Sequence, residues 1–79
     1  MKKPQYSKKA AKYINGLDRV SKQRIKDGCE KIPKGDIKPV EGCKDGSLRL
    51  RIGKYRIIFV IENNTAMIRE IGARGDIYK

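Results

Sequence analysis

An alternation of apolar and basic residues in the middle of the chain gives the clearest structural signal. Over residues 48–52, leucine and isoleucine alternate with Arg49 and Arg51. A period of two is typical of a β-strand that buries one face in a core and leaves the other in solvent. The pattern therefore predicts a strand whose solvent face carries arginine.

A glycine and a second apolar run follow this strand. Gly53 and Lys54 precede residues 55–61, which are β-branched or aromatic except at Arg56. Glycine readily takes the positive φ of the first central position in a type II′ turn. A two-residue loop then predicts an antiparallel hairpin that sets Arg51 opposite Arg56 on the solvent face. Like charges opposite each other cost up to about 1 kcal/mol, which a bound polyanion would offset.

Two helical segments are predicted before the hairpin. Residues 8–15 follow Ser7, a favourable N-cap, and residues 18–32 begin with Asp18, another favourable N-cap. Both segments place apolar residues at i, i+4 and i+7, which indicates one buried stripe each. Because the link between them is very short, we expect an antiparallel αα-hairpin.

The remaining segments give weaker signals. A short strand is expected at residues 5–6, and residues 33–47, with their prolines and glycines, predict a long loop with an extended piece at 37–38. Residues 63–65 predict a turn, and residues 66–71 predict a last strand that ends at the glycine after it. The buried face of that strand stays open, because the turn can hold three or four residues.

These elements predict an α+β fold, with the N-terminal αα-hairpin packed on a small, mainly antiparallel twisted sheet. A chain of 79 residues fits one domain with a modest core, and we expect that domain to span residues 1–79. No internal repeat or low-complexity tract is visible in the sequence.

Composition adds a strong positive charge to this picture. Lysine and arginine total 20 against 9 acidic residues, which gives a net charge of +11. The basic residues are spread along the whole chain, so a folded basic surface is expected rather than a basic arm. Such a surface attracts nucleic acid, acidic membranes or acidic proteins, and its binding weakens with salt.

Several kinds of site are excluded or disfavoured by composition. The chain has no histidine, so imidazole can serve neither as a base nor as a metal ligand. Cys29 and Cys43 are too few and too far apart for zinc, and Cys29 falls on an apolar helical stripe as a buried free thiol. We find neither an apolar run of about 20 residues nor a signal-peptide pattern. The expectation is a cytoplasmic protein without metal or cofactor.

Three stretches carry a recognisable order of residues. They are residues 6–10, residues 48–59 with the pattern Arg-x-Arg-x-Gly-x-Tyr-Arg, and residues 71–78 with the pattern Arg-x-x-x-Tyr. This order resembles the RelE/ParE superfamily of bacterial type II toxin–antitoxin toxins, and specifically a RelE-like mRNA interferase, over nearly the whole chain.

The resemblance implies a RelE-like fold and a defined activity. The expected activity is cleavage of mRNA in the ribosomal A site by attack of a 2′-hydroxyl on the adjacent phosphate, which leaves a cyclic phosphate and a 5′-hydroxyl. The expected partners are a cognate acidic antitoxin, the mRNA and ribosomal RNA.

The resemblance also assigns roles to individual residues. Arg49 and Arg56 match basic residues of the family's site, Arg74 matches its C-terminal arginine, and Tyr78 matches the aromatic that stacks on a base. Fixed guanidinium groups stabilise charge that develops on phosphate, and a tyrosine ring offers a stacking platform. Four further residues are expected to bind RNA: Lys44, Arg51, Lys54 and Lys79.

The chain departs from the family pattern at two positions. Ala73 stands where many relatives have histidine, and Ser47 stands where some have lysine. No conventional acid–base pair is therefore identifiable, and the remaining candidates for a base are Lys44, Lys54 and Glu41. Two other functions stay open: a ParE-like inhibitor of DNA gyrase, and a catalytically inactive basic RNA-binding module.

Overall fold

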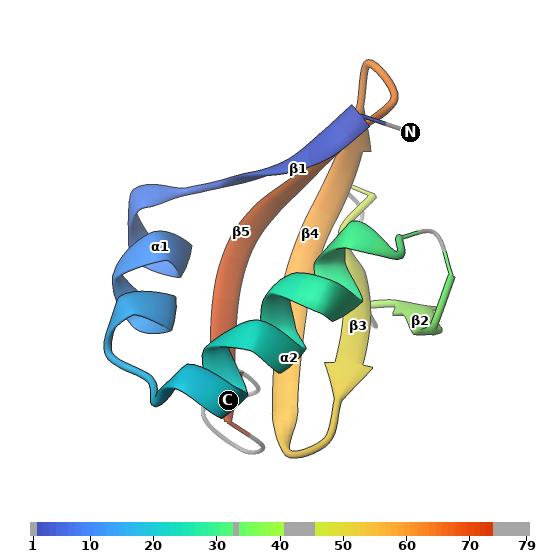
Figure 1. Cartoon of the computed structure of the whole chain (residues 1–79). Coiled ribbons are helices and arrows are strands. Elements are labelled where there is room, and N and C mark those ends of the chain that lie inside the picture. The colour runs from blue at the N-terminus through green and yellow to red at the C-terminus, as the bar shows by residue number, and fades with distance from the viewer. Residues whose placement is uncertain (1, 33, 41–45, 74–79) are drawn as a thin grey trace.

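Two helices cover one face of a five-stranded sheet in the computed structural model of this chain, which describes residues 2–32, 34–40 and 46–73 (Figure 1). Among these residues, none covers the opposite face, which we call the open face. The elements in chain order are β1 (Lys2–Tyr6), α1 (Lys8–Asn15), α2 (Arg19–Glu30), β2 (Asp36–Pro39), β3 (Leu48–Ile52), β4 (Tyr55–Glu62) and β5 (Thr65–Ala73).

The strands lie in the order β1-β5-β4-β3-β2. The first pair, β1 and β5, is parallel, and the other three pairs are antiparallel. The predicted α+β fold with a mainly antiparallel sheet is therefore confirmed. The N-terminal strand is longer than residues 5–6, and β2 is longer than residues 37–38.

The central hairpin has the predicted register. Arg51 lies opposite Arg56, and Leu50 lies opposite Ile57 on the face toward the helices. Gly53 has a φ of 56°, the left-handed conformation that a two-residue turn requires at its first central position. The second strand of the hairpin, β4, runs one residue past the predicted end.

The last turn and strand differ from the prediction. Asn63 and Asn64 both have positive φ, at 50° and 60°, and Glu62 pairs directly with Thr65. The loop therefore holds two residues, because asparagine tolerates the left-handed region that a type I′ turn demands. The strand β5 continues through Gly72, which was expected to end it, and Gly72 is paired with β4.

The second helix ends earlier than predicted. It stops at Glu30, and Lys31 forms the C-cap instead of a helix that reaches Ile32. The backbone N–H groups of Lys31 and Ile32 donate to Gly28 and Cys29, three residues back, which tightens the last turn. A residue before proline is disfavoured in the helical region, and Ile32 precedes a proline.

A β-bulge changes the phase of β5. Ile58 pairs with Glu70, whereas the next residue, Phe59, pairs with Ile68, so Arg69 is the extra residue in β5. The bulge allows Ile68 and Ile71 to be buried on the helix side although they are three residues apart. Alternation in the sequence gives no sign of such an insertion.

The core lies between the sheet and the two helices. Its largest fully buried side chains are Phe59, Ile25, Leu50, Ile57, Ile68 and Cys29. Helix α2 approaches β3 closely at Gly28, where an added Cβ would overlap the Cδ1 atom of Ile52. Glycine at this position therefore sets the distance between helix and sheet.

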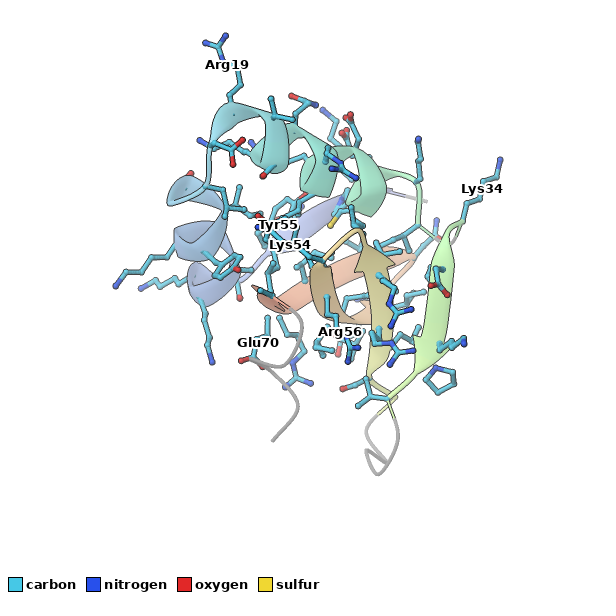
Figure 2. All side chains as sticks on the ribbon, turned by 90° about the horizontal axis from the view of Figure 1, so that it is seen from below. Arg19, Lys34, Lys54, Tyr55, Arg56 and Glu70 are labelled. Atoms are coloured by element: carbon cyan, nitrogen blue, oxygen red, sulfur yellow. The ribbon has the colours of Figure 1, made fainter. Side chains whose placement is uncertain are left out.

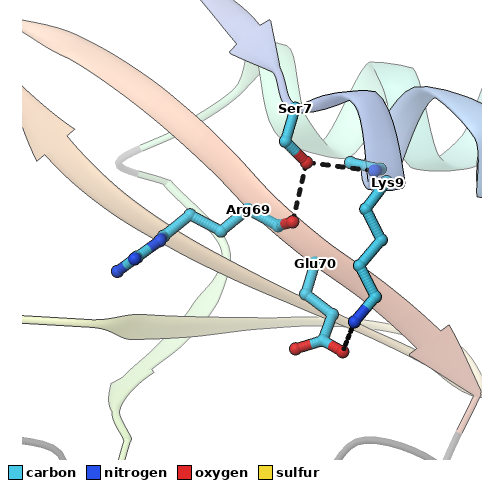
Figure 3. A network of polar contacts seen from close by, with 5 residues as sticks. Ser7, Lys9, Arg69 and Glu70 are labelled. Carbon is cyan, nitrogen blue, oxygen red and sulfur yellow. Dashed lines mark hydrogen bonds and ion pairs between the residues drawn. The ribbon is translucent and has the colours of Figure 1, made fainter.

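Polar contacts fix α1 on β5 (Figure 3). The Ser7 hydroxyl accepts a hydrogen bond from the backbone N–H of Ala10 at 3.0 Å, as expected of an N-cap, and donates to the Arg69 carbonyl at 2.7 Å. The Lys9 Nζ atom forms an ion pair with Glu70 at 2.9 Å. The bulge thus provides the carbonyl that receives the helix cap.

Candidate nucleic-acid interface

The open face of the sheet gathers basic side chains from three neighbouring strands. Arg51 of β3 lies opposite Arg56 of β4, and Arg49 of β3 is diagonal to Arg56 on the same face. On the other side of β3, Lys38 of β2 lies opposite Arg49. Directly opposite residues on a sheet are within about 5.5 Å of each other, and diagonal neighbours are within about 8 Å. We call Lys38, Arg49, Arg51 and Arg56 the arginine face.

Two of these side chains are anchored in the sheet surface. Arg49 and Arg56 are half-buried, and the Nε atom of each is shielded from solvent. Figure 2 shows Arg56 pointing away from the helices, whereas Tyr55, the preceding residue, lies on the helix side. An arginine held by its neighbours loses little further conformational freedom when it binds a ligand.

An open depression lies at the hairpin end of the arginine face. It has a volume of about 460 Å³ and is lined by Arg51, Gly53, Lys54 and Arg56. Guanidinium groups bind phosphate through two parallel hydrogen bonds, and ammonium groups bind it as point charges. The depression therefore offers charge and donors suited to a phosphodiester.

The other half of the open face is apolar. Ile58 and Val60 of β4 share the face of Arg56, and Met67 of β5 lies opposite Val60. Val60 and Met67 also line a second, larger hollow of about 580 Å³, together with Gln5 of β1. The open face is thus divided into an arginine half toward the hairpin and an apolar half toward β1.

The hairpin turn itself carries Lys54. Its Nζ atom lies 5.4 Å from the centre of the Tyr55 ring, and that ring packs edge-to-face on Tyr13 of α1 with centroids 6.4 Å apart. A cation over an aromatic face is attracted to it. Lys54 is therefore tied to the helix side of the turn while it also borders the depression.

The predicted site residues are only partly within the described residues. The structure brings Arg49, Arg51 and Arg56 together on one face, with Lys54 at its end. The candidates outside the described residues are Arg74, Tyr78, Lys44, Lys79 and Glu41. Ser47 is buried, and Ala73 lies opposite Tyr55 at the hairpin end of β5.

Two basic residues near this surface escaped the sequence analysis. Lys38 joins the arginine face because β2 pairs with β3; the expected extended piece at 37–38 contained this residue, but its pairing with β3 was not predicted. Arg69 is exposed and borders the larger hollow because of the bulge, for which the sequence offers no signal.

Two acid groups with raised pKa values, Cys29 and Tyr6, lie in or against the core and away from the arginine face. Cys29 is a buried free thiol, as predicted, and burial raises its pKa to about 11. Burial, followed by the proximity of Cys29, raises the pKa of the Tyr6 hydroxyl above its usual value of 10.0. Both groups are protonated at neutral pH and serve packing rather than proton transfer.

Two other kinds of feature are absent from the described part of the chain. Within it, histidine, cysteine, aspartate and glutamate form no cluster of three that could hold a metal ion. Neither helix there is long and apolar enough to span a bilayer.

The fold is similar to that of known toxin structures. The RelB–RelE antitoxin–toxin complex of Methanococcus jannaschii contains a chain with 26% identity, a TM-score of 0.75 and 94% coverage of both chains. The archaeal RelE–RelB complex of Pyrococcus horikoshii OT3 contains one with 24% identity, a TM-score of 0.71 and coverage of 95% of this chain and 99% of that one.

A third solved structure shares the fold at lower identity. It is the conserved hypothetical protein HP0894 of Helicobacter pylori, with 14% identity, a TM-score of 0.66 and coverage of 99% of this chain and 100% of that one. No protein-family model and no curated protein matches the chain. The structural comparisons confirm the RelE-like fold and the resemblance to RelE toxins.

Proposed function

We propose that this RelE-like chain is the toxin of a type II toxin–antitoxin pair and that it cleaves messenger RNA in the ribosomal A site. The toxin role is supported by the likeness to chains in two RelB–RelE complexes. The observation that carries the cleavage proposal is the arginine face, where Arg49, Arg51 and Arg56 project from adjacent strands toward one side. Three cations on one rigid surface suit a target with closely spaced negative charges.

The proposed reaction is a transesterification within the RNA. The 2′-oxygen attacks the adjacent phosphorus while the bond to the 5′-oxygen breaks, which gives a 2′,3′-cyclic phosphate and a 5′-hydroxyl. Negative charge builds up on the non-bridging oxygens in the transition state, and donors fixed in advance stabilise that charge. We assign this role to Arg56 and Arg49, because their stems are held in the sheet surface.

Proton transfer receives little help from the usual side chains. Histidine is absent from the sequence, and arginine does not lose its proton near neutral pH. Lys54 borders the depression, and we assign to its ammonium group the binding of phosphate. We therefore attribute most of the rate enhancement to charge and to the alignment of the mRNA by the ribosome. Arg74 and Tyr78 complete the proposed site as a further cation and a base-stacking ring.

The proposed protein partner is an acidic antitoxin. The open face pairs an arginine half with an apolar half formed around Ile58, Val60 and Met67. An amphipathic acidic segment would satisfy both halves at once, and by covering Arg56 it would block access of RNA. The assignment of an antitoxin partner is supported by the two similar structures, because each is a complex of RelE with RelB.

Induced expression followed by mapping of mRNA 5′ ends tests the proposal. Cuts in phase with codons should appear within translated regions for the wild type and disappear for Arg56→Ala. Lys34→Ala is the matched control, because Lys34 is exposed and points away from the arginine face (Figure 2). Intact mRNA together with DNA damage would contradict cleavage and favour a gyrase inhibitor.

A further inference from the structure

The hairpin turn is contacted by a basic side chain of α2. A Cβ placed on Gly53 would lie 3.4 Å from Nη2 of Arg24, so the guanidinium group rests against the turn. Residues 24 and 53 are far apart in the sequence, and nothing in the family motif includes Arg24. The contact adds a cation from the helix layer to the end of the sheet where the depression lies.

The surroundings of Arg24 leave its charge available to a ligand. Within the part of the chain that the structure describes, Arg24 has no ion-pair partner. The nearest acidic residue along its own helix is Asp27, whose carboxylate accepts a hydrogen bond from Gln23 at 2.8 Å. Arg24 is also exposed. An exposed guanidinium without a carboxylate partner keeps its donors for phosphate.

The turn thus carries cations on both of its sides. Arg51 and Arg56 lie on the open side of the sheet, and Lys54, over the Tyr55 ring, lies with Arg24 on the helix side. Because Gly53 has no side chain, nothing at that position separates the two pairs. We propose that Arg24 binds a backbone phosphate of the RNA, so that the strand held on the arginine face continues across the hairpin turn.

This inference rests on the proposed function, since it extends the same RNA contact. It predicts a contact to phosphate rather than to a base, and phosphate contacts carry no sequence preference. The chemistry required of the ligand is a single-stranded phosphodiester chain. The contact should therefore be equal on different sequences and should weaken with salt.

Binding of labelled oligouridine and oligoadenosine tests this assignment. Strands of about 12 nucleotides cover a typical single-strand site, and affinity is measured from low to moderate KCl for each protein. Arg24→Gln should weaken binding about tenfold at low salt on both strands, the effect of one lost charge-assisted hydrogen bond. It should also lower the slope of log affinity against log salt by about 0.7.

Arg19→Gln is the matched control on the same helix. Arg19 is exposed and points away from the sheet in Figure 2, so its loss should change the slope little. Thermal unfolding of both variants checks that neither change acts through folding.

The outcomes separate this inference from the proposed function. If the wild type binds RNA and Arg24→Gln binds as Arg19→Gln does, the Arg24 contact is wrong while the function stands. If Arg24→Gln shows the predicted loss but the wild type cuts no mRNA on ribosomes, the contact stands and the nuclease proposal fails. If the wild type binds neither strand, the Arg24 contact is overturned, and cleavage on programmed ribosomes decides the proposed function separately.

Discussion

At the scale of single residues, Arg56 has a constrained position on the open face. It lies on a central strand between Arg51 on β3 and Gly72 on β5, and its Nε atom is shielded from solvent. On β5, the carboxylate of Glu70 forms an ion pair with Lys9. Such a side chain presents its guanidinium group in a defined direction, as stabilisation of a transition state requires.

Substitution of Arg56 should separate catalysis from folding. Arg56→Ala is expected to slow cleavage on programmed ribosomes by roughly tenfold to a thousandfold, because a preorganised donor is lost. Arg56→Lys should fail as well, since a point charge cannot reproduce two parallel hydrogen bonds. Both variants should unfold within a few degrees of the wild type. Full cleavage by Arg56→Ala, or a loss explained wholly by unfolding, would remove Arg56 from the site.

The buried thiol predicts a dependence of stability on alkaline pH. Burial raises the pKa of Cys29 from 9.0 to about 11, so the folded chain holds this proton more tightly than the unfolded chain. The contribution of the protonated Cys29 thiol to the free energy of unfolding is therefore complete below pH 9 and is lost as pH rises toward 11.

A comparison of variants isolates the effect of Cys29 from other effects of alkaline pH. The free energy of unfolding should fall by up to about 1.4 kcal/mol per pH unit more in the wild type than in Cys29→Ala between pH 9 and 11. Urea unfolding at a series of pH values measures the difference. Parallel curves for the two proteins would show that Cys29 titrates alike in both states.

At the scale of elements, the sequence was most informative where one period ran undisturbed. Alternation over residues 48–52 and the glycine after it predicted the β3–β4 hairpin and its register. Ser7 and Asp18 predicted both helix starts, because each cap is a local hydrogen bond. The strand predicted at residues 66–71 lies within β5, but the two-residue asparagine turn and the Arg69 bulge, which set the phase of β5, were not predicted. The asparagines signal a turn but not its length, and the bulge depends on pairing with β4 and leaves no local pattern.

The contact between α2 and β3 predicts an asymmetry between two glycines. Gly28→Ala places a methyl group against the side chain of Ile52 and should destabilise the fold by about 1–3 kcal/mol. Gly16→Ala is the control, since Gly16 has a helical φ of −85° and an added Cβ would meet only atoms at 3.6 Å or beyond. That change should be neutral or stabilising by up to about 1 kcal/mol.

Removal of one methyl group from the partner side chain checks the cause. Ile52→Val deletes the Cδ1 atom that the new methyl group would overlap, so it should recover part of the stability lost in Gly28→Ala. Chemical denaturation measures the free energy of unfolding of both single variants and of the double variant. If the two changes are additive, the loss in Gly28→Ala has another origin, such as a change in the unfolded state.

At the scale of the whole molecule, the two faces of the sheet have different roles. The helices and the inner face of the sheet form the core, and the open face combines a cationic half with an apolar half. The charge of +11 predicted an anionic partner, and the pattern over residues 48–56 placed its arginines on one face. The roles of Arg74, Tyr78, Lys44 and Lys79 stay predictions from the family resemblance, since these residues lie outside the described residues.

This division predicts how the antitoxin should bind. An acidic amphipathic segment on the open face should raise the melting temperature of the complex above that of the free chain by linkage. Val60→Asp should weaken the complex, because a carboxylate in the apolar half would be buried against an acidic partner. The same change at Val20, which is 66% exposed on α2, should have little effect. Equal losses from both, measured by calorimetry, would place the antitoxin elsewhere.

Product analysis on programmed ribosomes tests the central claim most directly. Purified wild-type chain is added to ribosomes that hold a defined codon in the A site, and the mRNA fragments are examined for their ends. We expect one cut within that codon, with a cyclic phosphate on the upstream fragment and a 5′-hydroxyl on the downstream fragment. Intact mRNA in the presence of folded, RNA-binding protein would contradict the account.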